Sequence, residues 1–101
     1  MKLTPGTRLK SAVCDTEAVI VRVPADGAIQ CGGTAMIAFA DAKPDDGAVD
    51  PAFAGGSAIG KRYADAASGL EMLCTKAGAG TLAIDGRALE LREAKQLPSS
   101  D

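Results

Sequence analysis

The chain contains no histidine and no tryptophan, and its aromatic residues are Phe39, Phe53 and Tyr63. Histidine is the commonest general base near neutral pH and a frequent zinc ligand. Without it, Ser–His–Asp and Cys–His arrangements are excluded, and a metal site would depend on cysteine and carboxylate side chains. The sequence therefore holds no complete catalytic constellation, and it disfavours an enzyme without excluding one.

Long apolar runs and clustered basic residues are also missing. The longest uncharged apolar stretch, residues 34–40, is far shorter than the roughly 20 residues that cross a bilayer as a helix. The 11 basic residues are scattered, and the net charge is −2, so the basic footprint of a nucleic-acid-binding protein is absent. The start, Met1 to Gly6, has no apolar run after its positive charge and does not resemble a signal peptide. We expect a cytoplasmic protein with neither a membrane nor a nucleic acid as partner.

Hydrophobic residues make up 47% of the 101 residues, which is typical of one globular domain. Much of this fraction is alanine, which buries little area, so each residue adds less to the stability of the core. A second subunit, a metal or a partner protein would compensate for such a core, although none is required.

Apolar alternation and β-branched residues predict short strands throughout the chain. The predicted strands are residues 19–23, 29–31, 36–39, 70–74, 81–84 and 88–91. Residues 24–27 have turn composition and favour a hairpin between the first two strands, and Asp85-Gly86 favours another hairpin near the end. The one helix candidate, residues 61–68, is short and could equally belong to a loop. The predicted fold is mostly β, a small sandwich or partly open barrel of β-hairpins.

The predicted elements fall into one domain, residues 1–101. A first hairpin unit covers residues 1–40, and a second covers residues 61–91. Between them, residues 41–60 are acidic and rich in glycine and proline, which is typical of a long loop. Residues 92–101 form a polar tail.

An internal echo relates the two units at an offset of 53 residues. Residues 27–36 align with residues 80–89, with coincident glycines and apolar positions in phase. Upstream, residues 19–21 fall on residues 72–74. A duplication would produce two halves related by a pseudo-twofold axis, like a fused homodimer. The alternative is that two β-hairpins rich in glycine and alanine resemble each other by chance.

The region around Cys14 carries the most specific motif. Cys14-Asp15-Thr16-Glu17 leads into an apolar strand and a glycine turn, and then into the segment from Cys31 to Met36. This order resembles the desulforedoxin-like family of rubredoxin-type metal knuckles, in which Cys-x-x-Cys precedes the strand and Cys-Cys-Gly-x-x-Met follows the hairpin. The resemblance covers about a quarter of the chain, and about half if the echo is included.

The resemblance implies a metal knuckle in which two of the four cysteines remain. Cys14 and Cys31 stand at cysteine positions, and Gly33 and Met36 match the pattern, whereas Glu17 and Gly32 stand where the other thiolates belong. The implied ligands for zinc or iron are Cys14, Cys31 and Glu17, and an iron version would carry electrons. Because a closed site of this type needs four ligands, the shell is incomplete. The alternative is a vestigial knuckle with two small buried cysteines and no cofactor.

Other motifs carry less weight. Residues 55–61 match most of a P-loop, but Arg62 stands where Ser or Thr should hold magnesium. Cys74 is expected in the core of a strand, with Lys76 as the nearby cation. The pair Asp45-Asp46 has no apolar frame that would shift a carboxyl pKa.

These observations favour a non-catalytic accessory module that binds another protein, or a second copy of itself, through an edge strand or the long loop. The alternative is a small metal-binding or electron-transfer protein that uses Cys14 and Cys31.

Overall fold

Short strands and turns account for nearly all of the chain that the structure, a computed structural model, describes: residues 3–44 and 47–92. The strands are β1 (Arg8–Lys10), β2 (Glu17–Arg22), β3 (Ile29–Cys31), β4 (Thr34–Ala35), β5 (Ile37–Ala38), β6 (Arg62–Ala64), β7 (Glu71–Lys76), β8 (Leu82–Ile84), β9 (Arg87–Ala88) and β10 (Glu90–Arg92). One turn of 3-10 helix, η1, spans Pro51–Phe53.

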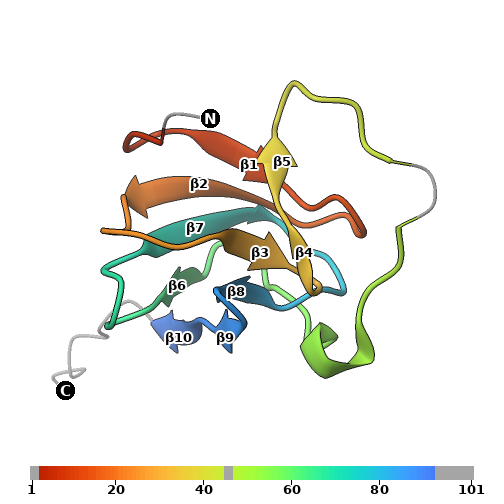
Figure 1. The fold of residues 1–101 in the computed structure, drawn as a ribbon. Helices are drawn as coiled ribbons and strands as arrows, with labels where there is room; N and C mark the ends of the chain where they lie inside the picture. The colour runs from red at the N-terminus through yellow and green to blue at the C-terminus, as the bar shows by residue number, and fades with distance from the viewer. Residues whose placement is uncertain (1–2, 45–46, 93–101) are drawn as a thin grey trace, which may run out of the picture.

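The strands form two antiparallel sheets (Figure 1). The larger sheet has the order β10-β6-β7-β2-β1-β5, and the smaller has the order β4-β3-β8-β9. Buried apolar side chains from both sheets make one core cluster, which includes Ile20 and Met72 from the larger sheet and Ile29, Leu82 and Ile84 from the smaller. This arrangement confirms the mostly β prediction and corresponds to a small sandwich that does not close into a barrel.

The strand orders are symmetric about the centre of each sheet. Replacing each of β1–β5 by the strand five places later, and each of β6–β10 by the strand five places earlier, gives both orders again in reverse. β2 and β7 also share one burial pattern along their six residues. The two halves of the chain therefore have corresponding strand orders in both sheets.

Hydrogen bonds in the connections repeat the same correspondence. Gly32 N donates to Thr81 O at 3.1 Å, and its counterpart Asp85 N donates to Ala28 O at 3.0 Å. Beyond the turns, Met36 N donates to Ile29 O and Leu89 N donates to Leu82 O. The offset between β3 and β8 is 53 residues. It is one residue larger for β2 and β7, because the connection from β2 to β3 is one residue longer than that from β7 to β8.

The predicted hairpin between residues 19–23 and 29–31 is wrong. β2 pairs with β1 and β7, whereas β3 pairs with β4 and β8 in the other sheet. The connection, residues 23–28, crosses from one sheet to the other, and Pro24 within it is buried. The turns at Gly32-Gly33 and Asp85-Gly86 do join hairpin partners. The turn composition of residues 24–27 correctly indicated that the chain changes direction there. It did not indicate that the following strand, β3, belongs to the other sheet.

Two further expectations change. Residues 61–68 are not helical: β6 occupies Arg62–Ala64 and a turn follows, so the P-loop-like residues 55–61 lead into a strand and lack the helix that a P-loop requires. The sequence analysis also missed β1. Its three residues carry one buried side chain, Leu9, between Arg8 and Lys10, and three residues are too few for a periodic signal.

The described part of residues 41–60 is mostly irregular, as predicted. η1 interrupts it, with the Asp50 carboxylate accepting a hydrogen bond from Ala52 N at 2.9 Å, and Ser57 forms an isolated antiparallel bridge with Gly78. The acidic pair Asp45-Asp46 and the tail beyond Arg92 lie outside the described residues. In the portion of the chain that is described, no helix has the length and apolarity to span a membrane.

Candidate thiol site

A tight turn between β1 and β2 holds Cys14. Ser11 N donates to Thr16 O at 2.8 Å and closes the turn. The Ser11 hydroxyl accepts hydrogen bonds from Val13 N at 3.1 Å and from Cys14 N at 3.0 Å. Both hydroxyl residues, Ser11 and Thr16, are fully buried. The turn therefore fixes the backbone of Cys14 from inside, and the cysteine itself is half-buried.

Cys31 reaches the same place from the smaller sheet. It is the last residue of β3 and is completely buried. Its Sγ lies 3.9 Å from Cys14 Sγ, and Cys14 Sγ donates to Thr16 Oγ1 at 3.3 Å. Cys14 and Cys31, 17 residues apart in sequence, thus form a thiol pair with buried hydroxyl groups beside it.

The glycine segment 78–80 covers this pair. A Cβ atom on Gly80 would lie 2.8 Å from Gly32 N and 3.0 Å from Cys31 Sγ, and one on Gly78 would lie within 2.4 Å of Thr16 N. Only glycine lets the backbone approach so closely. Ser57 secures the segment, because its hydroxyl donates to Gly80 O at 2.6 Å and its amide to Gly78 O at 2.9 Å.

The two thiols have different acidities. Burial raises the pKa of Cys14, but hydrogen bonds from the Ser11 and Thr16 hydroxyls and from the Thr16 and Gly80 backbone outweigh it, so the pKa is lowered to about 7. Burial and then the negative charge of Cys14 raise the pKa of Cys31 to about 12. The first proton to leave the pair as the pH rises therefore comes from Cys14.

Glu17, the third ligand implied by the resemblance, begins β2 and pairs in register with Lys10 of β1 and Lys76 of β7. Within residues 3–44 and 47–92, no three His, Cys, Asp or Glu side chains form a group that could hold a metal ion. Cys74 is a buried core residue of β7, as expected, and its thiol donates to Lys76 O at 3.2 Å.

The sequence analysis missed Ser11 and Thr16. Ser11 precedes Cys14 by three residues, which is the spacing within Cys-x-x-Cys. This spacing is the signal that would have identified Ser11, since its oxygen accepts from the two amides that follow. Thr16 gave no such signal, because its burial depends on Gly78 from a distant part of the chain.

The second half of the chain repeats the turn without the thiols. Asp65 N donates to Leu70 O at 2.9 Å, and the Asp65 carboxylate accepts from Ser68 N at 2.9 Å, as Ser11 accepts from Cys14 N. Arg87 binds this carboxylate at 2.9 Å. Its hydrogen bond, together with that from Ser68, lowers the pKa of Asp65 to about 2. The second half therefore has an ion pair between Asp65 and Arg87 at this turn and no thiol pair. Ile84, the last residue of β8, stands where Cys31 stands in β3.

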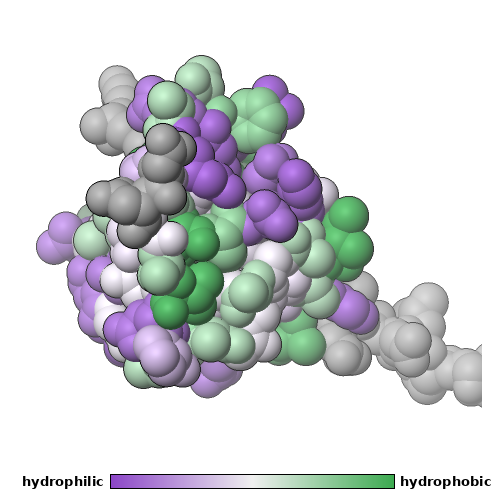
Figure 2. Space-filling model, turned by 90° about the vertical axis from the view of Figure 1, so that its right-hand side faces the viewer, coloured by the Kyte–Doolittle hydropathy of each residue, from purple (hydrophilic) through white to green (hydrophobic). Residues whose placement is uncertain are grey.

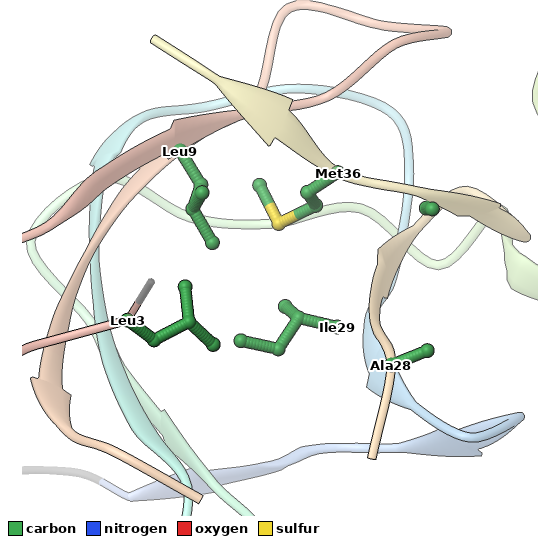
Figure 3. Close-up of a pocket in the computed structure, with 6 residues that line it drawn as sticks. Leu3, Leu9, Ala28, Ile29 and Met36 are labelled. Carbon is green, nitrogen blue, oxygen red and sulfur yellow. The ribbon is translucent and has the colours of Figure 1, made fainter. Parts of the chain in front are cut away.

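A second feature is an apolar pocket of about 190 Å³ between the sheets. The side chains of Leu3, Leu9, Ile29 and Met36 converge on it (Figure 3), and Ala28 and Ala35 complete the lining. All six lining residues are apolar. The pocket lies where β4, the edge of the smaller sheet, is followed by β5, the edge of the larger.

No family model matches the chain, and neither the curated proteins nor the solved structures include a similar one.

Proposed function

We propose that this protein is a small, non-catalytic cytoplasmic module that binds another protein, built on a degenerate form of the desulforedoxin-like metal knuckle. The pocket of Leu3, Leu9, Ala28, Ile29, Ala35 and Met36 carries the proposal. None of its lining side chains is polar, whereas ligand sites usually place a few polar side chains to orient a small polar substrate. Engineered cavities of about 150 Å³ hold one benzene ring, so this pocket suits one large apolar side chain of a partner.

The two halves of the chain carry different residues at the positions that correspond to the pocket. Tyr63 of β6 stands where Leu9 of β1 stands in the first half, and it packs against the core cluster. Its hydroxyl also accepts a hydrogen bond from Ala58 N at 2.8 Å. The pocket is therefore lined by Leu9 in the first half, whereas the matching position of the second half carries the larger side chain of Tyr63.

The surroundings of the pocket suit a protein partner. β5 is an edge strand of two residues, which leaves one side of its backbone available to an added strand. On the side of the molecule that carries the long loop, apolar patches lie among hydrophilic residues (Figure 2), a composition typical of protein interfaces. We infer that an extended partner segment pairs with β5 and inserts an apolar anchor into the pocket.

Selection of binders from a random peptide library displayed on phage tests this function. Peptides that bind the immobilised protein should share one aromatic or large aliphatic anchor. Ala35→Phe, which fills the pocket, should weaken their binding at least tenfold. Ala88→Phe is the matched control, because Ala88 is the equivalent exposed residue of β9. No selected peptides, or equal binding to both variants, would contradict the proposal. Self-association that only Ala35→Phe abolishes would identify a second copy as the partner.

The alternative function is metal binding, and the distance between the two sulfurs favours it. Two thiolates on one tetrahedral zinc ion, each at about 2.3 Å, lie about 3.8 Å apart, close to the 3.9 Å between Cys14 Sγ and Cys31 Sγ. The donor set fits only in part, because the neighbouring Ser11 and Thr16 hydroxyls are neutral oxygens and zinc prefers thiolate, imidazole or carboxylate. External ligands would have to complete the shell. The same would hold for iron, which would carry electrons.

Titration with zinc or iron(II) under reducing conditions separates this alternative from the first proposal. Metal binding through the thiol pair predicts one ion per chain, lost in Cys14→Ser and Cys31→Ser and retained in Cys74→Ser. Less than one ion per chain in the wild type would leave the protein-binding module as the function.

A further inference from the structure

We propose that Cys14 and Cys31 are a redox-active thiol pair that exchanges with low-molecular-weight disulfides and closes reversibly to a Cys14–Cys31 disulfide. The inference rests on the position of the pair and on neither function proposed above. Three features of the site support it: the distance between the sulfurs, their unequal access to solvent, and the hydroxyl groups at the exposed sulfur.

The distance favours closure within the chain. The sulfurs are 3.9 Å apart, and a disulfide bond is about 2.05 Å long, so they must approach each other by about 1.9 Å. Cys14 lies on a turn, where rotation of its side chain brings the sulfur closer without disturbing a strand. Cys31 is held at the end of β3 and keeps the second sulfur in place.

The difference in burial assigns the order of events. Cys14 is half-buried and accessible to a small disulfide, whereas Cys31 is completely buried. An external reagent therefore meets Cys14 first. The Thr16 hydroxyl lies 3.3 Å from Cys14 Sγ, within reach to donate a hydrogen bond to the attacking thiolate. Cys31, behind Cys14, is reached only by the sulfur of Cys14.

The exchange is balanced in two steps. Cys14 releases its proton to water, and its sulfur attacks one sulfur of glutathione disulfide; the disulfide bond breaks, and one glutathione leaves as a thiolate that takes up a proton. Cys31 then releases its proton, and its sulfur attacks Cys14 Sγ, so that the mixed disulfide breaks and the second glutathione leaves and is protonated. Two protein thiols lose two electrons, and one small disulfide is reduced to two thiols.

The product would join the two sheets. Cys14 belongs to the turn between two strands of the larger sheet, and Cys31 belongs to a strand of the smaller sheet. A bond between them would enclose β2 and its connection to β3 in a covalent loop. The Asp65–Ser68 turn of the other half cannot do this, because Ile84 stands in place of Cys31.

The test uses the full chain, reduced, treated with a chelator and then equilibrated with glutathione disulfide. The intact mass should fall by about 2 Da, for the loss of two hydrogens, and peptide mapping after alkylation should show the Cys14–Cys31 link with Cys74 still alkylated. Dithiothreitol should restore both thiols. Cys31→Ser should stop at the mixed disulfide of Cys14 with glutathione, Cys14→Ser should form neither product, and Cys74→Ser should behave like the wild type.

Several results would overturn the proposal. These are a folded wild-type protein that keeps three free thiols in excess glutathione disulfide, a link that involves Cys74, or a Cys31→Ser variant that forms no mixed disulfide. Circular dichroism of each variant establishes that it is folded. Because the chelator removes metal, and no peptide is present, the outcome is independent of both functions proposed above.

Discussion

At the scale of single residues, hydrogen bonds decide the chemistry of Cys14. Burial alone would raise its pKa, and the net lowering depends on hydroxyl and amide donors, first among them the Ser11 hydroxyl. Cys31 has the same neighbours but is fully buried and lies next to the Cys14 charge, so its pKa rises. The pKa of a cysteine thiol is therefore shifted in opposite directions at two residues whose sulfurs lie 3.9 Å apart.

The pH dependence of alkylation tests this assignment. Cys14 should react with iodoacetamide with a midpoint near pH 7, below the ordinary value of 9.0, whereas Cys31 and Cys74 should react slowly in the folded protein. Ser11→Ala should move the Cys14 midpoint upward, because it removes the hydroxyl that stabilises the thiolate. Cys74→Ser should leave it unchanged. A midpoint near 9 in the wild type would contradict the assignment.

The ionisation of the Cys14 thiol makes the free energy of unfolding depend on pH. A pKa lowered by folding means that the folded protein releases this proton before the unfolded chain does. The contribution of Cys14 to the free energy of unfolding is therefore present above about pH 9 and is lost as the pH falls through about 7. Cys31 has the opposite sign: its raised pKa removes stability as the pH rises above the ordinary value of 9.0.

At the scale of elements, close backbone contact holds the site together. Segment 78–80 connects β7 to β8 and lies against the β1–β2 turn at Gly78 and against Cys31 at Gly80. Ser57, from the irregular segment after η1, pairs with Gly78. Three connections far apart in the sequence thus meet at the thiol pair, and none of them is a regular strand.

Gly80→Ala tests this contact. The new methyl group would lie 2.8 Å from Gly32 N and 3.0 Å from Cys31 Sγ, so we expect a loss of about 1–3 kcal/mol of stability together with altered alkylation of Cys14. Gly60→Ala is the control. Its methyl group meets nothing within 4 Å, and its φ of +79° costs about 1–2 kcal/mol of backbone strain. Chemical unfolding and alkylation rates measure both effects. Altered thiol reactivity in Gly60→Ala, or none in Gly80→Ala, would contradict the role of the segment.

At the scale of the whole molecule, strand pairing joins the two halves of the chain in both sheets. β2 pairs with β7, and β3 pairs with β8, so each half completes both sheets of the other. The long loop connects the halves at the periphery (Figure 1). Its later part is tied to the body, since Asp50 N donates to Gly32 O at 2.9 Å and Thr81 N donates to Phe53 O at 2.8 Å.

Subtilisin should therefore make its first cut in the long loop, within residues 40–48. Cuts within residues 49–57 should follow later. A protease must draw several residues into its active site, and hydrogen bonds to the body oppose this. Mass spectrometry of the first fragments locates the cut. A first cut within residues 50–57, or within a strand, would mean that these hydrogen bonds do not protect the loop.

The amino-acid sequence was sufficient for the features that depend on neighbouring residues. Alternating apolar residues predicted β2, β3, β7 and β8 to within a few residues, and Asp85-Gly86 predicted its hairpin turn. The resemblance to the metal knuckle pointed to Cys14 and Cys31, whose sulfurs lie 3.9 Å apart in the structure. Side-chain period and turn chemistry are local properties, so a single chain displays them.

Only the tertiary structure decided which strands pair and what surrounds the thiols. The connection from β2 to β3 changes sheets because the apolar faces of both strands must be buried against each other, and this packing has no signature in its turn composition. Thr16 and Gly80 belong to the site because distant segments meet there. The pocket is lined by Leu3, by Leu9 and by four residues between positions 28 and 36, which come from three separate parts of the chain. These properties arise from contacts between segments that are far apart in the sequence, which no local pattern encodes.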